Sequence, residues 1–245
     1  MKFSRVREFV KDILPFAYFG ILYDLLRYIP KSWAGPIHVA WPYQLEKGLF
    51  GFLWEGQRII PNEFFQTHQN PLLDVITAVT YSLHMVIPVA FFFYAWLKNR
   101  PLAIRFSWTF LVVNLFAFVT YVALPVAPPW YVEQFGLGPG RWDVLGDAAG
   151  LKNFDLWIGT PYFQNVYAKS AWVHGAIPSM HAGFPLLVLL FAGRISKRLM
   201  IPAGLFLALV WCSAVYLRHH YLIDLLAGAL YVLAAYLVIG RDRRS

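Results

Sequence analysis

The sequence contains little of what holds water-soluble and disulfide-bonded proteins together. Of its 245 residues one is cysteine and 14% are charged, whereas soluble domains carry about one quarter charged residues. The single cysteine, Cys212, excludes an intramolecular disulfide and a cysteine-based metal site. Because 59% of the residues are hydrophobic, the composition argues against a water-soluble globule and favours a protein embedded in lipid.

Positive charge is in excess, but its distribution does not favour nucleic acid as a partner. The formal net charge is +8, and the basic residues fall in short runs between apolar segments instead of along one stripe. Aromatic residues make up 18% of the chain, which is typical of proteins whose amphipathic rings settle at both membrane surfaces. The charge pattern therefore indicates orientation in a membrane.

Six apolar stretches approach the roughly 20 residues that a helix needs to cross a bilayer. They cover residues 12–30, 72–97, 103–126, 177–193, 199–217 and 221–240. Asp24 and Arg27 interrupt the first stretch three residues apart, where they can form an ion pair near its outer end. The predicted fold is all-α: a polytopic membrane helix bundle of about six transmembrane helices, forming a single domain over residues 1–245.

Two segments between these stretches predict structure at the membrane surface. Residues 38–65 mix apolar and aromatic residues with charged ones, among them Glu46, Lys47, Glu55 and Arg58, which predicts an amphipathic helix lying along the interface. Residues 127–176 begin with several prolines and glycines and continue with polar residues, which predicts an ordered loop that caps a site.

Lysine and arginine gather on one side of a six-helix arrangement. That side carries both termini and receives 13 of the 21 basic residues: Lys2, Arg5, Arg7, Lys11, Lys98, Arg100, Arg105, Arg194, Lys197, Arg198, Arg241, Arg243 and Arg244. Because cytoplasmic loops collect the excess of lysine and arginine, we expect both termini in the cytoplasm. Segments 31–71 and 127–176 and the turn at 218–220 then lie on the opposite, extracytoplasmic face.

Polar residues from distant parts of the sequence are expected to meet on that opposite face. Ser179 and His181 open the fourth predicted helix, whereas Arg218, His220 and Asp224 lie around the end of the fifth and the start of the sixth. The fourth helix starts on the side where the fifth one ends, so both groups share one face.

The spacing of these residues predicts phosphoryl-transfer chemistry. His220 and Asp224 are four apart at a helix start, so the carboxylate can fix one imidazole tautomer and leave the other ring nitrogen free to attack an electrophile. Ser179 is placed to cap the fourth helix, whose first amides suit a phosphate. His181 beside that phosphate would protonate a departing alkoxide and later deprotonate an incoming hydroxyl. This route uses neither a metal ion nor another cofactor.

The alternative interpretation of His181 and His220 is a pair of interfacial histidines that hydrogen-bond to lipid head groups. A carboxylate four residues from one histidine and a helix-capping serine beside the other favour catalysis over that alternative. His84, inside the second apolar stretch, is either a substrate-lining group or an interhelical hydrogen-bond partner.

At these residues the sequence resembles the type 2 phosphatidic acid phosphatase superfamily, whose hallmarks are a Pro-Ser-x-His segment, here 178–181, and a later His-x-x-x-Asp segment, here 220–224. Within that superfamily it is most similar to the inositol phosphorylceramide synthase branch, through residues 127–131, 175–181 and 219–224. The resemblance covers about residues 70–240. It implies a phosphohistidine intermediate on His220, oriented by Asp224, with His181 as general acid and then general base.

The chain departs from the superfamily at the cations that bind phosphate. No lysine and Arg-Pro segment precedes residues 127–131, and Ala214 stands where an arginine usually follows Ser213. The available substitutes on the same face are Arg218, His219, Lys169 and Arg141. Arg218 is the first choice because it is close in sequence to the predicted nucleophile.

We therefore expect a membrane enzyme that moves a phospho-alcohol head group from a phospholipid to the hydroxyl of a second lipid, ceramide-like or other. Membrane lipids are the expected partners. Two alternatives stay open: a lipid phosphate or lipid pyrophosphate phosphatase, in which water intercepts the same intermediate, and a non-catalytic lipid-binding or transport protein. A transferase needs a second lipid as acceptor, whereas a phosphatase does not. A non-catalytic protein would keep its function in His220→Ala, whereas either enzyme would lose it.

Overall fold

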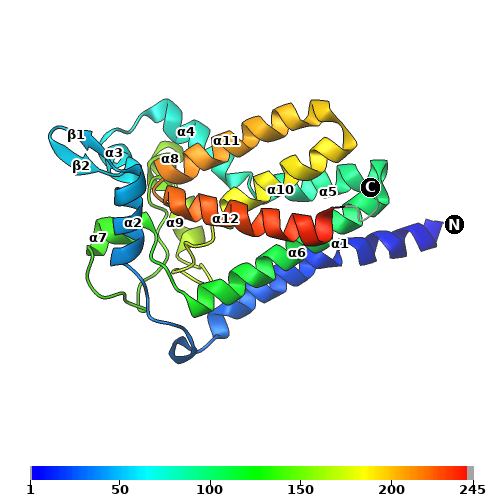
Figure 1. Cartoon of the computed structure of the whole chain (residues 1–245), viewed down its shortest axis with the longest axis horizontal. Coiled ribbons are helices and arrows are strands. Elements are labelled where there is room, and N and C mark those ends of the chain that lie inside the picture. The colour runs from blue at the N-terminus through cyan, green and yellow to red at the C-terminus, as the bar shows by residue number, and fades with distance from the viewer. Residues whose placement is uncertain (1, 242–245) are drawn as a thin grey trace.

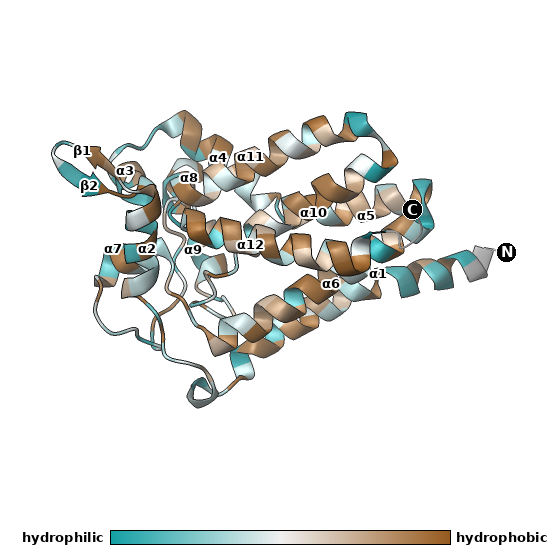
Figure 2. Cartoon of the chain, viewed as in Figure 1, coloured by the Kyte–Doolittle hydropathy of each residue, from teal (hydrophilic) through white to brown (hydrophobic). Residues whose placement is uncertain are grey.

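A computed structural model describes residues 2–241 of the chain. Its long helices lie side by side in one bundle, with the first and the last described residues at the same end (Figure 1). These helices are α1 (Lys2–Leu25), α4 (Pro71–Ser82), α5 (Val86–Lys98), α6 (Arg100–Ala123), α10 (Met180–Ile195), α11 (Met200–Tyr216) and α12 (Leu222–Ala235). Their middle sections are mostly hydrophobic (Figure 2), as the hydrocarbon core of a bilayer requires. Helices suit that core because their backbone groups are hydrogen-bonded without water.

Short elements collect at the other end of the bundle, which we call the site end (Figure 1). They are α2 (Ala40–Phe50), β1 (Phe52–Trp54), β2 (Gln57–Ile59), α3 (Pro61–Thr67), α7 (Pro129–Phe135), α8 (Leu151–Ile158) and α9 (Tyr162–Tyr167). The predicted loop over residues 127–176 thus contains three short helices.

The prediction of one interfacial helix over residues 38–65 is wrong. An antiparallel hairpin interrupts this segment, pairing Phe52 with Ile59 and Trp54 with Gln57. Its two turn residues, Glu55 and Gly56, both have positive φ, 48° and 78°, and this conformation matches the right-handed twist of paired strands. The tight turn therefore forms a hairpin where the amphipathic pattern predicted a helix, and the fold contains a two-stranded sheet besides its helices.

Within the described residues, three helical segments are long and apolar enough to cross a membrane by length and composition: Arg100–Ala123, Lys197–Tyr216 and Leu222–Gly240. A fourth is the pair α4 and α5, which are bent by 48° relative to each other. Helix α10 is apolar but has 16 residues, and the first half of α1 carries several charges. The chain is thus an integral membrane protein built mainly of helices.

The bend between α4 and α5 has local causes. Ser82 and Thr80 donate their hydroxyls to carbonyls four residues back, a bond that favours helix bending. Pro88 lacks the N–H that the carbonyl of residue 84 would receive in a continuous helix. His84 lies at this break, where its Nδ1 is 2.7 Å from the carbonyl oxygen of Tyr81.

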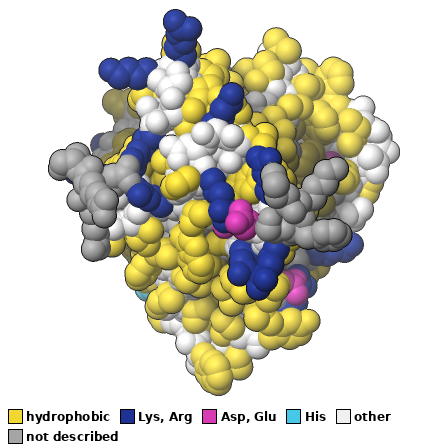
Figure 3. Space-filling model, turned by 90° about the vertical axis from the view of Figure 1, so that its right-hand side faces the viewer, with side chains coloured by type: hydrophobic (Ala, Val, Ile, Leu, Met, Phe, Trp, Pro, Cys, Tyr) yellow, Lys and Arg dark blue, Asp and Glu magenta, His cyan; other side chains and the backbone are white. Residues whose placement is uncertain are grey.

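The end that carries the described termini is rich in exposed lysine and arginine, with few acidic side chains among them (Figure 3). Asp12 accepts there from Arg100 at 2.6 Å and from Trp96 at 2.9 Å, and Arg194 donates to the carbonyl of Gly240 at 2.9 Å. Arg243 and Arg244, which count toward the predicted basic side, lie outside the described residues. At the opposite end of α1, the predicted ion pair between Asp24 and Arg27 is confirmed at 2.6 Å.

Candidate active site

Backbone hydrogen bonds join the three segments that carried the predicted motifs. The N–H of Ser179, just before α10, donates to the carbonyl of Asp224 in α12 at 3.0 Å. The N–H of Trp130, at the start of α7, donates to the carbonyl of Arg218 at 3.1 Å. Segments far apart in sequence therefore meet at one place on the site end, because backbone groups buried there need partners.

A glycine permits this close approach. A side chain at Gly228, one turn after Asp224, would overlap the backbone carbonyl of Ser179. Only a residue without a Cβ lets α12 pack so tightly against the start of α10.

Asp224 and His220 form the predicted pair. His220 Nδ1 lies 3.3 Å from Asp224 Oδ2, and the same oxygen accepts the N–H of Tyr221 at 2.9 Å. Because Nδ1 faces a carboxylate, we assign the ring hydrogen to Nδ1. His220 Nε2 therefore keeps its lone pair.

His181 lies directly against that lone pair. Its Nδ1 is 3.1 Å from His220 Nε2, so His181 donates from Nδ1 in the unliganded site. Ser179 caps α10 by accepting the N–H of Ala182 at 3.4 Å, as the sequence predicts. The cap holds His181 in the first turn of the helix, where backbone amides point towards the site end.

Burial keeps the two histidines of the turn between α11 and α12 uncharged. It lowers the pKa of His220 to about 3, and the pKa of His219 likewise to about 3, where His220 and Arg218 add to the effect. Desolvation disfavours the charged imidazolium form of a buried histidine. Both imidazoles are therefore neutral at physiological pH in the unliganded site.

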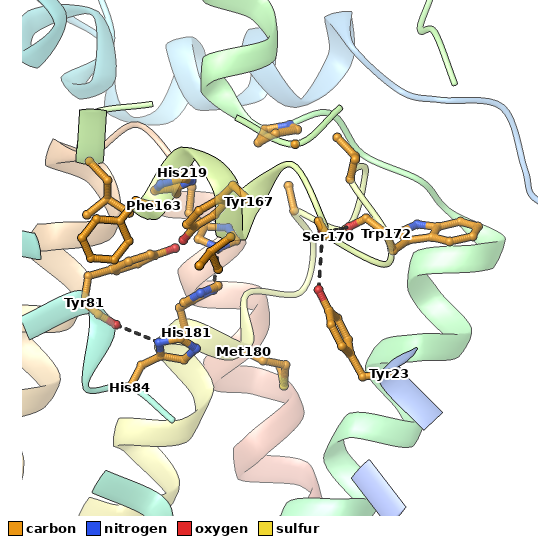
Figure 4. Close-up of a pocket in the computed structure, with 18 of the residues that line it drawn as sticks. Tyr23, Tyr81, His84, Phe163, Tyr167, Ser170, Trp172, Met180, His181 and His219 are labelled. Atoms are coloured by element: carbon orange, nitrogen blue, oxygen red, sulfur yellow. Dashed lines mark hydrogen bonds between the residues drawn. The ribbon is translucent and has the colours of Figure 1, made fainter. Parts of the chain in front are cut away.

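A cavity of about 390 Å³ adjoins His220 Nε2. Its walls are largely aromatic, and Figure 4 shows His219 beside Tyr81 and Tyr167, with His181 and His84 below them. His219 stacks between the two tyrosines, at centroid distances of 5.2 Å and 4.6 Å. The exposed residues of the lining belong to α1, α4 and α9: Tyr23, Ser82, Tyr162 and Val166. The cavity thus opens sideways between these helices.

Comparison with known proteins agrees with this architecture. The sequence profile of the PAP2 superfamily matches residues 54–238. The chain belongs to this superfamily. It is also 36% identical to the phosphoinositol dihydroceramide synthase of Bacteroides thetaiotaomicron over 225 residues, which cover 91% of this chain and 73% of that protein.

Fungal proteins are similar as well. The inositol phosphorylceramide synthase catalytic subunit of Schizosaccharomyces pombe is 34% identical, over 85% of this chain and 48% of that protein. The corresponding subunit of Saccharomyces cerevisiae is 28% identical, over 94% of this chain and 56% of that protein. The chain thus spans about half the length of these fungal relatives. No solved structure matches it at a significant level.

These similarities confirm the predicted resemblance, including the inositol phosphorylceramide synthase-like branch of the PAP2 superfamily. With the family, the class of enzyme is confirmed: a membrane protein that acts on lipids as a phosphotransferase or phosphatase.

The structure brings together part of the predicted set of site residues. His84, His181, His219 and His220 line the cavity. Asp224 and Ser179 are fully buried behind them, where they hold His220 and the start of α10.

The three basic residues proposed as phosphate ligands lie elsewhere. Arg218 is buried and pairs with Glu133 at 2.8 Å beside a separate cavity of about 90 Å³. Arg141 pairs with Asp143 at 2.8 Å, and Lys169 is exposed outside the cavity lining. Among residues 5–241, no lysine or arginine lines the larger cavity.

Glu46 is a site residue that the sequence did not reveal. Its fully buried carboxylate accepts the N–H groups of Leu222 and Ile223, at 3.0 Å and 3.1 Å, and so caps α12 beside Asp224. Burial raises the pKa of Glu46 to about 7, although the two backbone hydrogen bonds oppose this. In the sequence, Glu46 is marked only as an acidic residue within an apolar segment, and the helix that it caps begins 176 residues later, at Leu222.

Among the described residues, no cluster of three or more His, Cys, Asp or Glu side chains is arranged to hold a metal ion.

Proposed function

We propose that this protein transfers an inositol-phosphate-type head group from a phospholipid to the hydroxyl of a ceramide-like lipid, through a phosphohistidine on His220. The observation that carries the proposal is the chain of contacts Asp224–His220–His181 beside a laterally open, aromatic cavity. The names of the similar synthases supply the head group and the acceptor class.

In the first half-reaction, His220 Nε2 attacks phosphorus. A new N–P bond forms, the P–O bond to diacylglycerol breaks, and Asp224 stabilises the positive charge that develops on the ring. The phosphate anion favours the imidazolium form of His181, which gives its proton to the departing alkoxide.

In the second half-reaction, His181 takes the proton of the acceptor hydroxyl. The acceptor oxygen bonds to phosphorus, the N–P bond breaks, and His220 returns to its neutral form. Water in place of the lipid hydroxyl would give hydrolysis, which is the phosphatase alternative.

The resting site has no room for phosphorus between the two histidines. Their nitrogens are 3.1 Å apart, in hydrogen-bond contact, so a phosphoryl group on His220 Nε2 requires His181 to move aside. The ring of Tyr81 stacks on that of His181 with their centroids 4.5 Å apart, and the centroid of the His84 ring lies 4.0 Å from that of His181. These rings guide that movement.

We propose that histidines replace the cations that the rest of the superfamily uses for phosphate. His219 has a buried Nε2 without a hydrogen-bond partner and lines the cavity, and His84 contacts His181 from the opposite side. The first amides of α10 add the positive end of a helix dipole. Ala214, at the position of the missing arginine, is fully buried in a core cluster.

We further propose six crossings, with α1 and α10 added to the four candidate spans. An even number fits both described ends of the chain lying together at the end where lysine and arginine gather (Figure 3). By the excess of positive charge in cytoplasmic loops, that end is cytoplasmic and the active site is extracytoplasmic.

The decisive experiment for the function is trapping of the intermediate. The purified protein in detergent is incubated with phosphate-labelled phosphatidylinositol, with and without ceramide, alongside His220→Ala and the control His68→Ala, whose histidine is exposed at the same end. Acid-labile label on the wild type and on His68→Ala, but absent from His220→Ala, supports the phosphohistidine. Ceramide-dependent product supports the transferase, release to water alone supports a phosphatase, and activity in His220→Ala contradicts the mechanism.

Orientation is tested separately by cysteine labelling in cells. In a Cys212→Ala background, an impermeant thiol reagent should label Thr160→Cys, in the loop between α8 and α9, and should leave Ser196→Cys, between α10 and α11, unlabelled. The reverse pattern would overturn the proposed orientation.

A further inference from the structure

The lining of the cavity includes a buried amide that the phosphoryl-transfer chemistry does not use. Asn114 lies in the middle of α6, is 0% exposed and lines the cavity. Its Nδ2 donates to the carbonyl of Phe110 at 2.7 Å. Because that carbonyl can only accept, the nitrogen must face it, and Asn114 Oδ1 is left without a hydrogen-bond partner.

Helix packing places Asn114 level with the reacting groups. Phe110 of α6 packs against Phe184 of α10, with the two ring centroids 4.6 Å apart. Asn114 lies one turn after Phe110 on α6, and His181 lies about one turn before Phe184 on α10. Both steps lead towards the site end, because α6 ends there and α10 begins there. Figure 4 shows Met180 and His181 on one wall and Tyr23 of α1, the neighbour of α6, on the other.

The surroundings of Asn114 are apolar. Phe110 and Phe118 lie one turn before and one turn after it on α6, and Phe19 of α1 packs on both, at 5.1 Å and 5.9 Å. A phosphate or a polyol head group is poorly matched to such a wall, whereas the upper part of a lipid chain fits it.

We infer that Asn114 Oδ1 accepts a hydrogen bond from the acceptor lipid and so selects acceptors with a second donor, an amide N–H or a further hydroxyl, beside the reacting hydroxyl. An amide oxygen only accepts, so a lipid that offers only ester carbonyls there leaves it buried and unpaired. A ceramide has such donors beside its primary hydroxyl, and a diacylglycerol has none once its single hydroxyl reacts. The inference rests on the proposed transferase function and names its specificity-determining residue.

The test compares two acceptors in three proteins: wild type, Asn114→Leu, which keeps the volume and removes the oxygen, and Ser107→Ala. Ser107 is a matched control because it is equally buried on α6 and its hydroxyl bonds within the helix to Ile104, away from the cavity lining. The Michaelis constant and the turnover number are measured for transfer from phosphatidylinositol to ceramide and, as exchange into phosphatidylinositol, to a radiolabelled diacylglycerol. Phosphohistidine formation, which needs no acceptor, is measured beside them.

The wild type and Ser107→Ala should prefer ceramide. Asn114→Leu should raise the Michaelis constant for ceramide about tenfold or more, with little change for diacylglycerol and with labelling of His220 retained. Asn114→Thr should restore part of the preference. Its hydroxyl can donate to Phe110, as Thr109 donates to Arg105 at 2.7 Å, and still present lone pairs to the cavity.

Equal effects of Asn114→Leu on both lipids and on labelling would show a structural role and overturn the inference. An unchanged Michaelis constant for ceramide would overturn it too, as would a wild type that forms the phosphohistidine but transfers to water alone. A wild type that forms no phosphohistidine would instead contradict the proposed function. Thermal unfolding in detergent identifies a variant that fails to fold, in which case Asn114→Thr decides.

Discussion

The two ends of the helix bundle differ in where their charged side chains lie: some are buried at the site end, whereas most are exposed at the other end. At the site end, Glu46 and Arg218 are buried and each has a partner within the protein: Glu46 accepts two backbone N–H groups of α12, and Arg218 pairs with Glu133. At the other end, lysine and arginine stand exposed over apolar helices (Figure 3). The first arrangement holds specific atoms in place through hydrogen bonds, whereas the second supplies a field that depends on the sum of many charges.

This comparison teaches which residues tolerate change. A buried charge is held by specific partners, so removing one partner leaves the other uncompensated. An exposed charge contributes through its number and sign, so single changes cost little. The following predictions test that contrast, beginning with the largest expected effect.

Asp224→Asn should lower the turnover number roughly 10³-fold or more, because the amide nitrogen can face His220 Nδ1 and place the ring hydrogen on Nε2, where it blocks attack. Asp143→Asn at the same end is the control, since Asp143 is exposed. Steady-state turnover and acid-labile labelling measure the effect. A loss below about tenfold would show that the carboxylate does not set the tautomer.

Gly228→Ala should lower turnover on the order of 10²-fold and reduce the free energy of unfolding by about 1–3 kcal/mol, because the new Cβ pushes α12 away from Ser179 and displaces His220 from His181. Gly204→Ala on α11 is matched to it, since the nearest atom to a new Cβ there is Leu189 Cδ1 at 4.0 Å. Turnover and unfolding in detergent are compared. Equal behaviour of the two variants would contradict the close contact.

Glu46→Gln should flatten the dependence of stability on pH. The pKa of Glu46 is raised from 4.5 to about 7 in the folded protein, so the folded state binds more protons than the unfolded state between these values. The stabilisation from this group is therefore complete below about pH 4.5 and is lost as the pH rises through 7. Glutamine cannot titrate.

Thermal unfolding at pH 6.5, 7 and 8 measures this effect. That window lies above the range in which His219 and His220 contribute, because their lowered pKa values affect stability only below about 6.5. Glu55→Gln, in the exposed turn of the hairpin, is the control. If wild type and Glu46→Gln lose stability in parallel from pH 6.5 to 8, Glu46 is ionised throughout.

Lys197→Ala and Arg198→Ala, exposed between α10 and α11, should each change the free energy of unfolding by no more than about 0.5 kcal/mol. Their turnover should equal that of the wild type, because the charges act on orientation during insertion and not on the site. Unfolding and turnover in detergent measure both. A large loss in either variant would remove the contrast between the two ends.

Much of this protein follows from local sequence. Apolar runs near the length of a bilayer crossing predict the long helices, since burial of backbone polar groups in lipid requires them. The interval of four between His220 and Asp224 predicts their contact, and Ser179 before Met180 predicts the cap of α10, because both depend on a single helical turn. Helix parity alone places these two groups on one face.

The tertiary structure decided what depends on partners distant in the chain. Arg218 was the first choice for a phosphate ligand, yet Glu133, 85 residues away, holds it outside the cavity. Glu46 caps a helix 176 residues further on, and Asn114, which lines the cavity, keeps its amide oxygen unpaired because Phe110 holds the nitrogen. A sequence fixes which groups a segment carries and, through helical periodicity, which of them share a face. Which buried polar group finds which partner, and which one stays unpaired in the cavity lining, is decided only when the helices pack, because these partners come from distant segments of the chain.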